Sequence, residues 1–271
     1  MFNATFMALA KEAQFTKDML GAGATQIRNA NYAEKGIYFQ AFTSLSTGLE
    51  RIGKLCLLLD YYINNNGQFP DFNYLKKHIG HDISLLYQKS IDVKNQRSLE
   101  FHFLQNLNTT IHQNILNILS SFAIGDRYSN INLLTSSKQQ SDPISDWFSK
   151  VDIPIFDQRV TDKEKQKIAR NAQIISEMTQ PFTIVRHSSE SGSEIDNVKE
   201  ASFRTGMQNT VAPYRQLYVI QIIRFWTELL ISLQYEAMSV GKQEIPFFSE
   251  ILGGFYNPDS CIFTIKTWDT I

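Results

Sequence analysis

The segment from residue 33 to residue 65 constrains the fold most strongly, because its apolar side chains recur alternately four and three residues apart. The recurring residues are Tyr38, Phe42, Leu45, Leu49, Ile52, Cys56, Leu59 and Ile63. This spacing places them along one face of an α-helix. Such a helix spans roughly 50 Å. The run NNNG at 64–67 predicts its end, because Asn and Gly tolerate the left-handed backbone of a helix stop.

The apolar stripe of this helix must be covered, and two arrangements would cover it. Other helices of the same chain would pack on it in a helical bundle, whereas a second copy would pack on it in a coiled-coil dimer. We expect the stripe to be core within one chain, because neighbouring helices are available to bury it. Gly48 and Gly53 lie inside the segment. Each lowers helix propensity by about 1 kcal/mol, so they indicate a kink or a close crossing by a neighbour.

Helical patterns continue on both sides of this segment, and strand patterns are scarce. Predicted helices cover residues 5–20, 72–79, 83–90, 110–125, 161–178, 194–208 and 213–240, with a break at GAGA (21–24). Asp82, Asp142 and Thr161 are the predicted N-caps of the helices that follow them. The serine-rich segment 186–195 is typical of an exposed loop. The sequence therefore predicts an all-α protein.

A polar stretch at 135–141 predicts a boundary between a first part, 1–135, and a second part, 136–271. We expect a helical bundle in the first part. The second part is then a helical extension packed onto it, either as a separate unit or as one continuous domain. The tail 261–265 fits a strand or an extended segment equally well. Arg224 and Glu228 stand four residues apart in an otherwise apolar helix and are expected to pair.

Charge gives little indication of a nucleic-acid-binding surface. Lys and Arg number 26 and Asp and Glu number 27, for a net charge of -1. A protein that binds through phosphates usually has an excess of positive charge. The first 135 residues hold 12 basic and 10 acidic side chains and the remainder holds 14 and 17, so a phosphate-facing patch is expected in the first half.

The composition favours a cytoplasmic protein outside the membrane. The two cysteines, Cys56 and Cys261, lie far apart in apolar runs, which favours free buried thiols in a reducing compartment. The most apolar stretch, 217–237, contains two charged side chains that would be costly in lipid. We expect no transmembrane segment.

Familiar catalytic and cofactor motifs are absent from the sequence. The five histidines form no His-Glu-x-x-His pair, and no Cys-x-x-Cys, phosphate-binding glycine loop or Gly-x-Ser-x-Gly elbow occurs. The sequence therefore predicts neither a protein-built metal centre nor a bound cofactor.

Three segments of the first half carry a resemblance to a known family. They are ERIGKL (50–55) in the long helix, KKHIGHDISLLY (76–87) at a turn and DRY (126–128) near the end of a later helix. Over about 130 residues, 5–135, the chain resembles the HEPN superfamily of helical proteins. The resemblance implies a HEPN-like bundle, a setting in prokaryotic antiviral defence or toxin systems, and activity on RNA as a metal-independent endoribonuclease.

The resemblance also implies a site. HEPN ribonucleases use an Arg followed four to six residues later by a His, and Arg97 and His102 match that spacing. The His would exchange protons at the ribose, and the Arg would stabilise charge on the phosphate. Such sites usually form between two chains, so the resemblance implies a homodimer. Two alternatives stay open: Arg97 and His102 are ordinary solvent-facing residues, and the chain is a non-catalytic helical interaction or scaffold protein with a protein partner.

Overall fold

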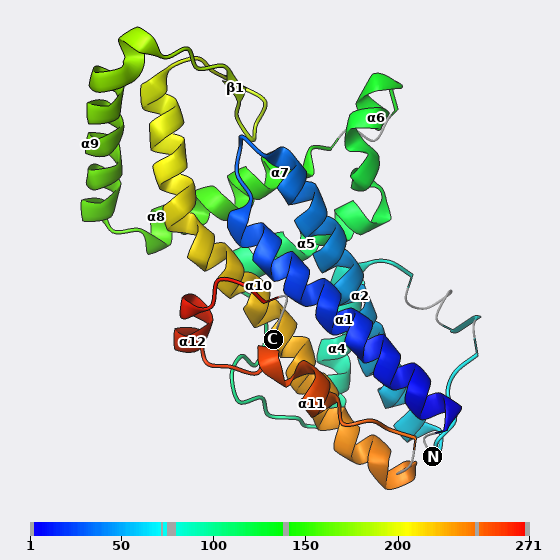
Figure 1. Ribbon diagram of the computed structural model, residues 1–271. Coiled ribbons are helices and arrows are strands. Elements are labelled where there is room, and N and C mark those ends of the chain that lie inside the picture. The colour runs from blue at the N-terminus through cyan, green and yellow to red at the C-terminus, as the bar shows by residue number, and fades with distance from the viewer. Residues whose placement is uncertain (1–2, 72, 75–79, 138–140, 242–243, 269–271) are drawn as a thin grey trace.

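The computed structural model describes residues 3–71, 73–74, 80–137, 141–241 and 244–268. Helices dominate it (Figure 1), which confirms the all-α prediction. The long helices are α1 (Ala4–Asn29), α2 (Lys35–Asn64), α4 (Ile83–Gln96), α5 (Thr110–Ile124), α9 (Asp162–Thr179) and α10 (Val198–Val240). The short ones are η1 (Asp126–Tyr128), α6 (Ser129–Leu134), α7 (Pro143–Trp147), η2 (Phe148–Asp152), α8 (Ile153–Arg159), η3 (Gln180–Phe182), α11 (Phe248–Leu252), η4 (Gly253–Phe255) and α12 (Asp259–Thr264). The predicted helix at 72–79 lies mostly outside the described residues.

Helix α10 is the element around which the others are arranged. The antiparallel hairpin of α1 and α2 packs along it, and α4 and α5 close on α2. Helices α11 and α12 cover another side of α10. At the far end, α9 packs on the first turns of α10 and the two project together as an arm (Figure 1). No helix in the described part of the chain combines the length and apolar character needed to cross a bilayer.

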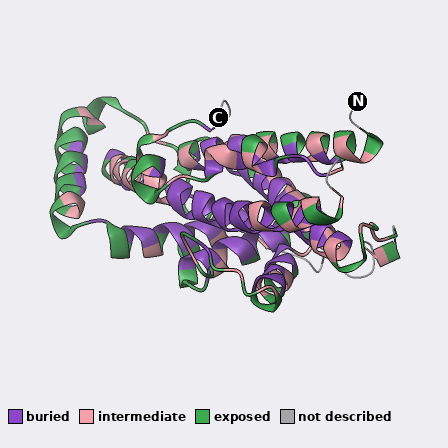
Figure 2. Ribbon diagram, turned by 90° about the horizontal axis from the view of Figure 1, so that it is seen from below, coloured by how far each residue is buried: buried purple, intermediate pink, exposed green. Residues whose placement is uncertain are grey.

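The predicted apolar stripe of α2 is core within one chain. Leu45, Leu49, Ile52, Cys56 and Leu59 are each at most 1% exposed, so the monomer covers the stripe without a second copy. Buried residues concentrate in the central helices (Figure 2). One apolar cluster runs from Leu9 to Trp268, and it crosses the boundary expected near residue 135.

Glycines let α1 and α2 approach closely, and this overturns the predicted break at 21–24. Helix α1 continues through Gly21 and Gly23 to Asn29. A Cβ atom at Gly23 would lie 2.6 Å from the Leu45 side chain, and one at Gly48 would lie 2.7 Å from that of Leu20. The prediction failed because these glycines serve interhelical contact rather than chain reversal. Of the two alternatives for Gly48, a kink or a close crossing, the structure shows the close crossing.

Helix α10 is continuous where two helices were expected at 194–208 and 213–240. Pro213 lies inside it, although proline was expected to open a new helix. Proline has no N–H, so the carbonyl of Asn209 loses its partner four residues on. Val211 and Arg215, two residues to either side of Pro213, are at most 1% exposed. Packing of these neighbours keeps the helix intact through the proline.

The segment 186–195 is mostly exposed, as predicted, but it forms a short hairpin rather than an irregular loop. Its strands β1 (His187–Ser188) and β2 (Glu194–Ile195) are antiparallel, with His187 opposite Ile195. Glu190 between them is 1% exposed. It accepts hydrogen bonds from Gln208 and, at 3.3 Å, from Arg204. The serine-rich composition hid this buried carboxylate, which ties the hairpin to α10.

A buried ion pair in the second half of the chain also holds two groups of the first half. Arg215 of α10 donates to Asp152 of η2 at 2.7 Å from Nε and 2.5 Å from Nη2. It also donates to the carbonyl of Ala30 at 2.6 Å and to the Tyr38 hydroxyl at 3.0 Å. Trp147 donates to Asp152 at 3.1 Å. Arg215 and Asp152 are each 1% exposed, so nearly every polar atom of the pair is satisfied by protein.

The predicted caps are confirmed. The side chains of Asp82, Asp142 and Thr161 each accept a backbone N–H in the first turn of α4, α7 and α9. The hydroxyl of Ser120 also donates to Asp82 at 2.7 Å, which adds a tertiary contact that the sequence did not indicate.

Two expectations near the C-terminus are wrong. Arg224 pairs with Asp259 at 2.8 Å rather than with Glu228, because α12 brings the aspartate over α10. The tail that was expected to be a strand or extended forms α12, and this leaves Cys261 exposed whereas Cys56 is buried.

We predict that Leu49→Ala lowers the free energy of unfolding by about 2 to 5 kcal/mol, because it leaves a cavity between packed helices. Leu85→Ala on α4 is the matched control, since Leu85 is 41% exposed and should cost less than about 1 kcal/mol. Urea denaturation measures both. Equal losses would contradict the placement of Leu49 in the core.

A second prediction concerns His112, which is 3% exposed. Its Nε2 donates to Gln221 at 2.9 Å, and its Nδ1 accepts from the Thr109 hydroxyl at 2.8 Å, as a neutral ring does. Burial lowers the pKa of His112 from 6.5 to about 4. Because the folded pKa lies below the ordinary value, the unfolded chain takes up this proton first. The stability contribution is present above about pH 6.5 and is lost as pH falls toward 4.

The stability advantage of the wild type over His112→Gln should therefore shrink by about 3 kcal/mol between pH 7 and pH 4. Glutamine keeps a polar group at the position but does not titrate. Denaturation of both proteins at a series of pH values measures the difference. A difference that stays constant with pH would show that folding leaves the pKa of His112 unchanged and would contradict the prediction.

Candidate functional site

Arg97 lies at the C-terminal end of α4 and is held by acceptors on two other helices. Its Nε donates to Asp60 at 2.7 Å, its Nη2 to Asn64 at 2.8 Å, and its Nη1 to Glu236. The arginine side chain is 12% exposed. This guanidinium ties α2, α4 and α10 together, and its charge is already balanced by two carboxylates.

His102 follows α4 in an exposed connection, and its ring lies against other aromatic rings. The ring centroid is 4.7 Å from that of Phe103 and 6.3 Å from that of Tyr256. Its backbone N–H donates to Glu228. Arg97 instead contacts Glu236 of α10. Glu236 lies eight residues after Glu228, so the two glutamates are about 12 Å apart along the helix. Within one chain the structure does not bring the Arg97 guanidinium and His102 together on a shared partner.

A cavity of about 520 Å³ lies elsewhere, between the α1–α2 connection and α10. Its lining comes from three separate segments of the chain. They supply Arg28, Asn29, Ala30, Asn31, Tyr32 and Ala33 from the connection, Thr205, Gln208, Asn209, Ala212 and Pro213 from α10, and Lys266 from the segment after α12. This cavity is the candidate functional site.

The connection keeps its shape through local and tertiary hydrogen bonds. The Asn31 side chain accepts the backbone N–H groups of Ala33 and Glu34 at 2.9 and 3.0 Å, which forms an Asx turn. The Tyr32 hydroxyl donates to the carbonyl of Ala201 at 3.2 Å. The carbonyl of Ala30 is held by the buried ion pair described above. The cavity wall is therefore fixed before any ligand arrives.

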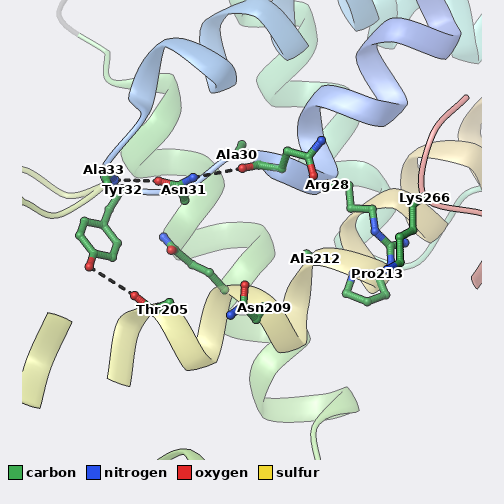
Figure 3. A pocket seen from close by; sticks show the side chains of 12 residues that line it. Arg28, Ala30, Asn31, Tyr32, Ala33, Thr205, Asn209, Ala212, Pro213 and Lys266 are labelled. Carbon is green, nitrogen blue, oxygen red and sulfur yellow. Dashed lines mark hydrogen bonds between the residues drawn. The ribbon is translucent and has the colours of Figure 1, made fainter. Parts of the chain in front are cut away.

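Two cations line the cavity at one end. Arg28, Pro213 and Lys266 are drawn together there, with Tyr32 and Thr205 at the opposite end (Figure 3). Arg28 donates to Gln216 at 2.7 Å, which fixes its direction. Neither cation forms an ion pair with another described residue, and none of the described lining residues is acidic. Burial lowers the pKa of Arg28 below its ordinary value.

The middle of the cavity offers hydrogen-bonding groups. The side chains of Asn29 and Asn209 make no hydrogen bond to another described residue, although both line the cavity. Pro213 removes the intrahelical donor of the Asn209 carbonyl, so a backbone acceptor is free at the same position. Amide donors, a free carbonyl and two cations together suit a polar ligand with negative charge at one end.

Sequence reasoning did not find this site. The predicted first helix ended at residue 20, which left 28–33 in an unstructured link. The available clue was the segment QIRNANY at 26–32. It ends a helix without a glycine and supplies several amide side chains there. Lys266 has no sequence pattern that connects it with residue 28.

Comparison with protein-family models, with curated proteins and with solved structures finds no match to this chain. The chemistry of the cavity is therefore what points to a function. Among the described residues, no three His, Cys, Asp or Glu side chains come together as a metal site requires.

We predict that Arg97→Ala lowers the free energy of unfolding by about 1 to 3 kcal/mol, because it leaves Asp60 and Glu236 without their counter-charge in a half-buried position. His102→Ala should change stability by less than about 0.5 kcal/mol. The exposed Lys163→Ala on α9 serves as a charge-matched control.

The same proteins test the ribonuclease hypothesis. Wild type incubated with mixed cellular RNA and EDTA is expected to leave the RNA intact if Arg97 is structural. Cleavage by wild type that is lost in His102→Ala, with stability unchanged, would instead support the catalytic pair implied by the HEPN resemblance.

Proposed function

We propose that this chain is a non-catalytic helical binding protein whose cavity holds a small phosphorylated molecule. The observation that carries the proposal is the pair of Arg28 and Lys266 in a cavity of about 520 Å³ with no acidic side chain among its described lining residues. Most arginines in the centre of the fold have a carboxylate partner, as Arg97 and Arg215 do. A cavity that keeps two cations unpaired is suited to receive an anion.

Phosphate fits this end better than a carboxylate does. A phosphate monoester carries a charge of nearly -2 at neutral pH, which balances both cations, whereas a carboxylate balances one. The planar guanidinium of Arg28 presents parallel N–H groups to phosphate oxygens, and the ammonium of Lys266 adds a flexible point charge. Gln216 already orients Arg28, so little conformational entropy is lost when the ligand binds.

The rest of the ligand is expected to carry hydroxyl or amino groups. The freed carbonyl of Asn209 accepts such a donor, and the side-chain amides of Asn29 and Asn209 both donate and accept. A cavity of about 520 Å³ lies within the range of pockets that enclose a small organic molecule. Sugar phosphates and mononucleotides combine these features.

Isothermal titration calorimetry tests the proposal with ribose 5-phosphate and adenosine monophosphate, each beside its unphosphorylated parent. We predict that only the phosphorylated members bind and that Lys266→Glu weakens their binding by about tenfold or more, because a carboxylate replaces a cation at the phosphate end. Arg28→Gln should weaken binding similarly while it retains a polar contact with Gln216.

Lys163→Glu is the matched control, because Lys163 is exposed on α9 and does not line the cavity. It makes the same change in net charge and should leave the affinity within about twofold. Equal affinity for ribose and ribose 5-phosphate, or a Lys266→Glu protein that binds as wild type does, would overturn the proposal.

A further inference from the structure

The arm formed by α9 and the start of α10 exposes apolar side chains away from the cavity. Helix α9 buries Ile168, Ala172 and Ser176, the face that it turns toward α10. The apolar residues left exposed on α9 and just beyond it are Ile174 (46%), Ile175 (44%), Met178 (71%), Phe182 (90%) and Ile184 (92%). Apolar side chains gathered on a projecting element are typical of an interaction surface.

The outer face of α9 carries charges in a definite order. Arg170, Ile174 and Glu177 are spaced four and three residues apart, so they share one face, roughly opposite the buried stripe. Arg170 makes no ion pair with a described residue, and Glu177 accepts a hydrogen bond only from Gln173, at 2.7 Å. Lys163 extends the basic part toward the start of the helix, whereas Lys167 pairs with Glu164 at 3.4 Å. The face is basic before Ile174 and acidic after it.

We propose that this face binds the same face of a second copy of the chain, with the two α9 helices antiparallel across a two-fold axis beside Ile174. In that arrangement residues equally far before and after the axis lie opposite each other. Arg170 of each copy then meets Glu177 of the other, and the two Ile174 side chains pack between the ion pairs. The contact is self-complementary, as a two-fold interface requires.

Antiparallel packing also covers the exposed apolar end of the arm. Phe182 lies in η3, directly beyond the C-terminal end of α9, and this end faces the first turns of the other α9 in the antiparallel arrangement. The stems of Lys163 and Lys167 in those turns offer apolar methylene surface for the ring. Antiparallel helices additionally place their opposite dipole ends side by side, which is favourable. This contact is independent of the cavity and of its ligand.

Sedimentation velocity of the full chain over a concentration series up to about 200 μM, a range suited to a weak dimer, tests the proposal. Wild type is expected to show a monomer–dimer equilibrium. Arg170→Glu and Glu177→Arg should each weaken dimerisation by about tenfold or more, because each places like charges opposite each other twice. The double variant Arg170→Glu with Glu177→Arg exchanges the charges and should restore dimerisation to within about threefold of wild type.

Lys11→Glu is the charge-matched control and should leave the equilibrium unchanged. Lys11 is exposed and lies in the N-terminal half of α1, and the N-terminal end of that helix points away from α9 (Figure 1). Wild type that stays monomeric throughout would assign the arm to a different partner and overturn the proposal. A double variant that dimerises as poorly as the single variants would also overturn it, because it would show that the two residues do not face each other.

Discussion

The buried pair of Arg215 and Asp152 positions the first half of the chain on the second, because Arg215 also donates to Ala30 and Tyr38. Removing two charges from water is costly, and the cost is offset here because nearly every polar atom has a partner. Burial lowers the pKa of Arg215, but the adjacent Asp152 outweighs that effect and holds the pKa above its ordinary value. Since the guanidinium also binds the carbonyl of Ala30, a shift of α10 along α1 would leave one of its N–H donors unsatisfied in the core. The pair therefore specifies one register of the helices, and the cavity wall beside Ala30 follows from that register.

Local sequence patterns correctly predicted those helices and caps for which local preference and tertiary contacts favour the same structure. The stripe of α2 and the caps at Asp82 and Thr161 depend on spacing and on hydrogen bonds within one turn, so they are readable from the sequence. The failures at Gly23 and Pro213 have the opposite cause. Each residue is unfavourable in an isolated helix, yet tertiary contact decides the outcome: Leu45 occupies the space over Gly23, and packed neighbours carry α10 through Pro213.

The site was harder to predict for a related reason. Arg97 and His102 were chosen by their spacing, but spacing carries no information about the acceptors that a side chain meets. Asp60 and Glu236 come from helices distant in sequence, and they account for Arg97 as a residue that joins helices. The cavity residues Arg28 and Lys266 are 238 positions apart. Their significance lies in the missing carboxylate partner, which is a property of the folded chain alone.

Helix α10 contributes to both the apolar core and the polar cavity, through different parts of its length. Its middle, from Arg215 to Leu230, is buried and belongs to the core, whereas the residues before Pro213 face the cavity on one side and α9 on another. An unpaired cation in a half-buried position lowers stability, and so does a helix carbonyl without its donor. Both features occur at the same place, beside Asn209 and Pro213, while the core around Arg215 is well satisfied. A fold tolerates local cost of this kind where a ligand offsets it, and this coincidence is the physical reason for assigning function to the cavity.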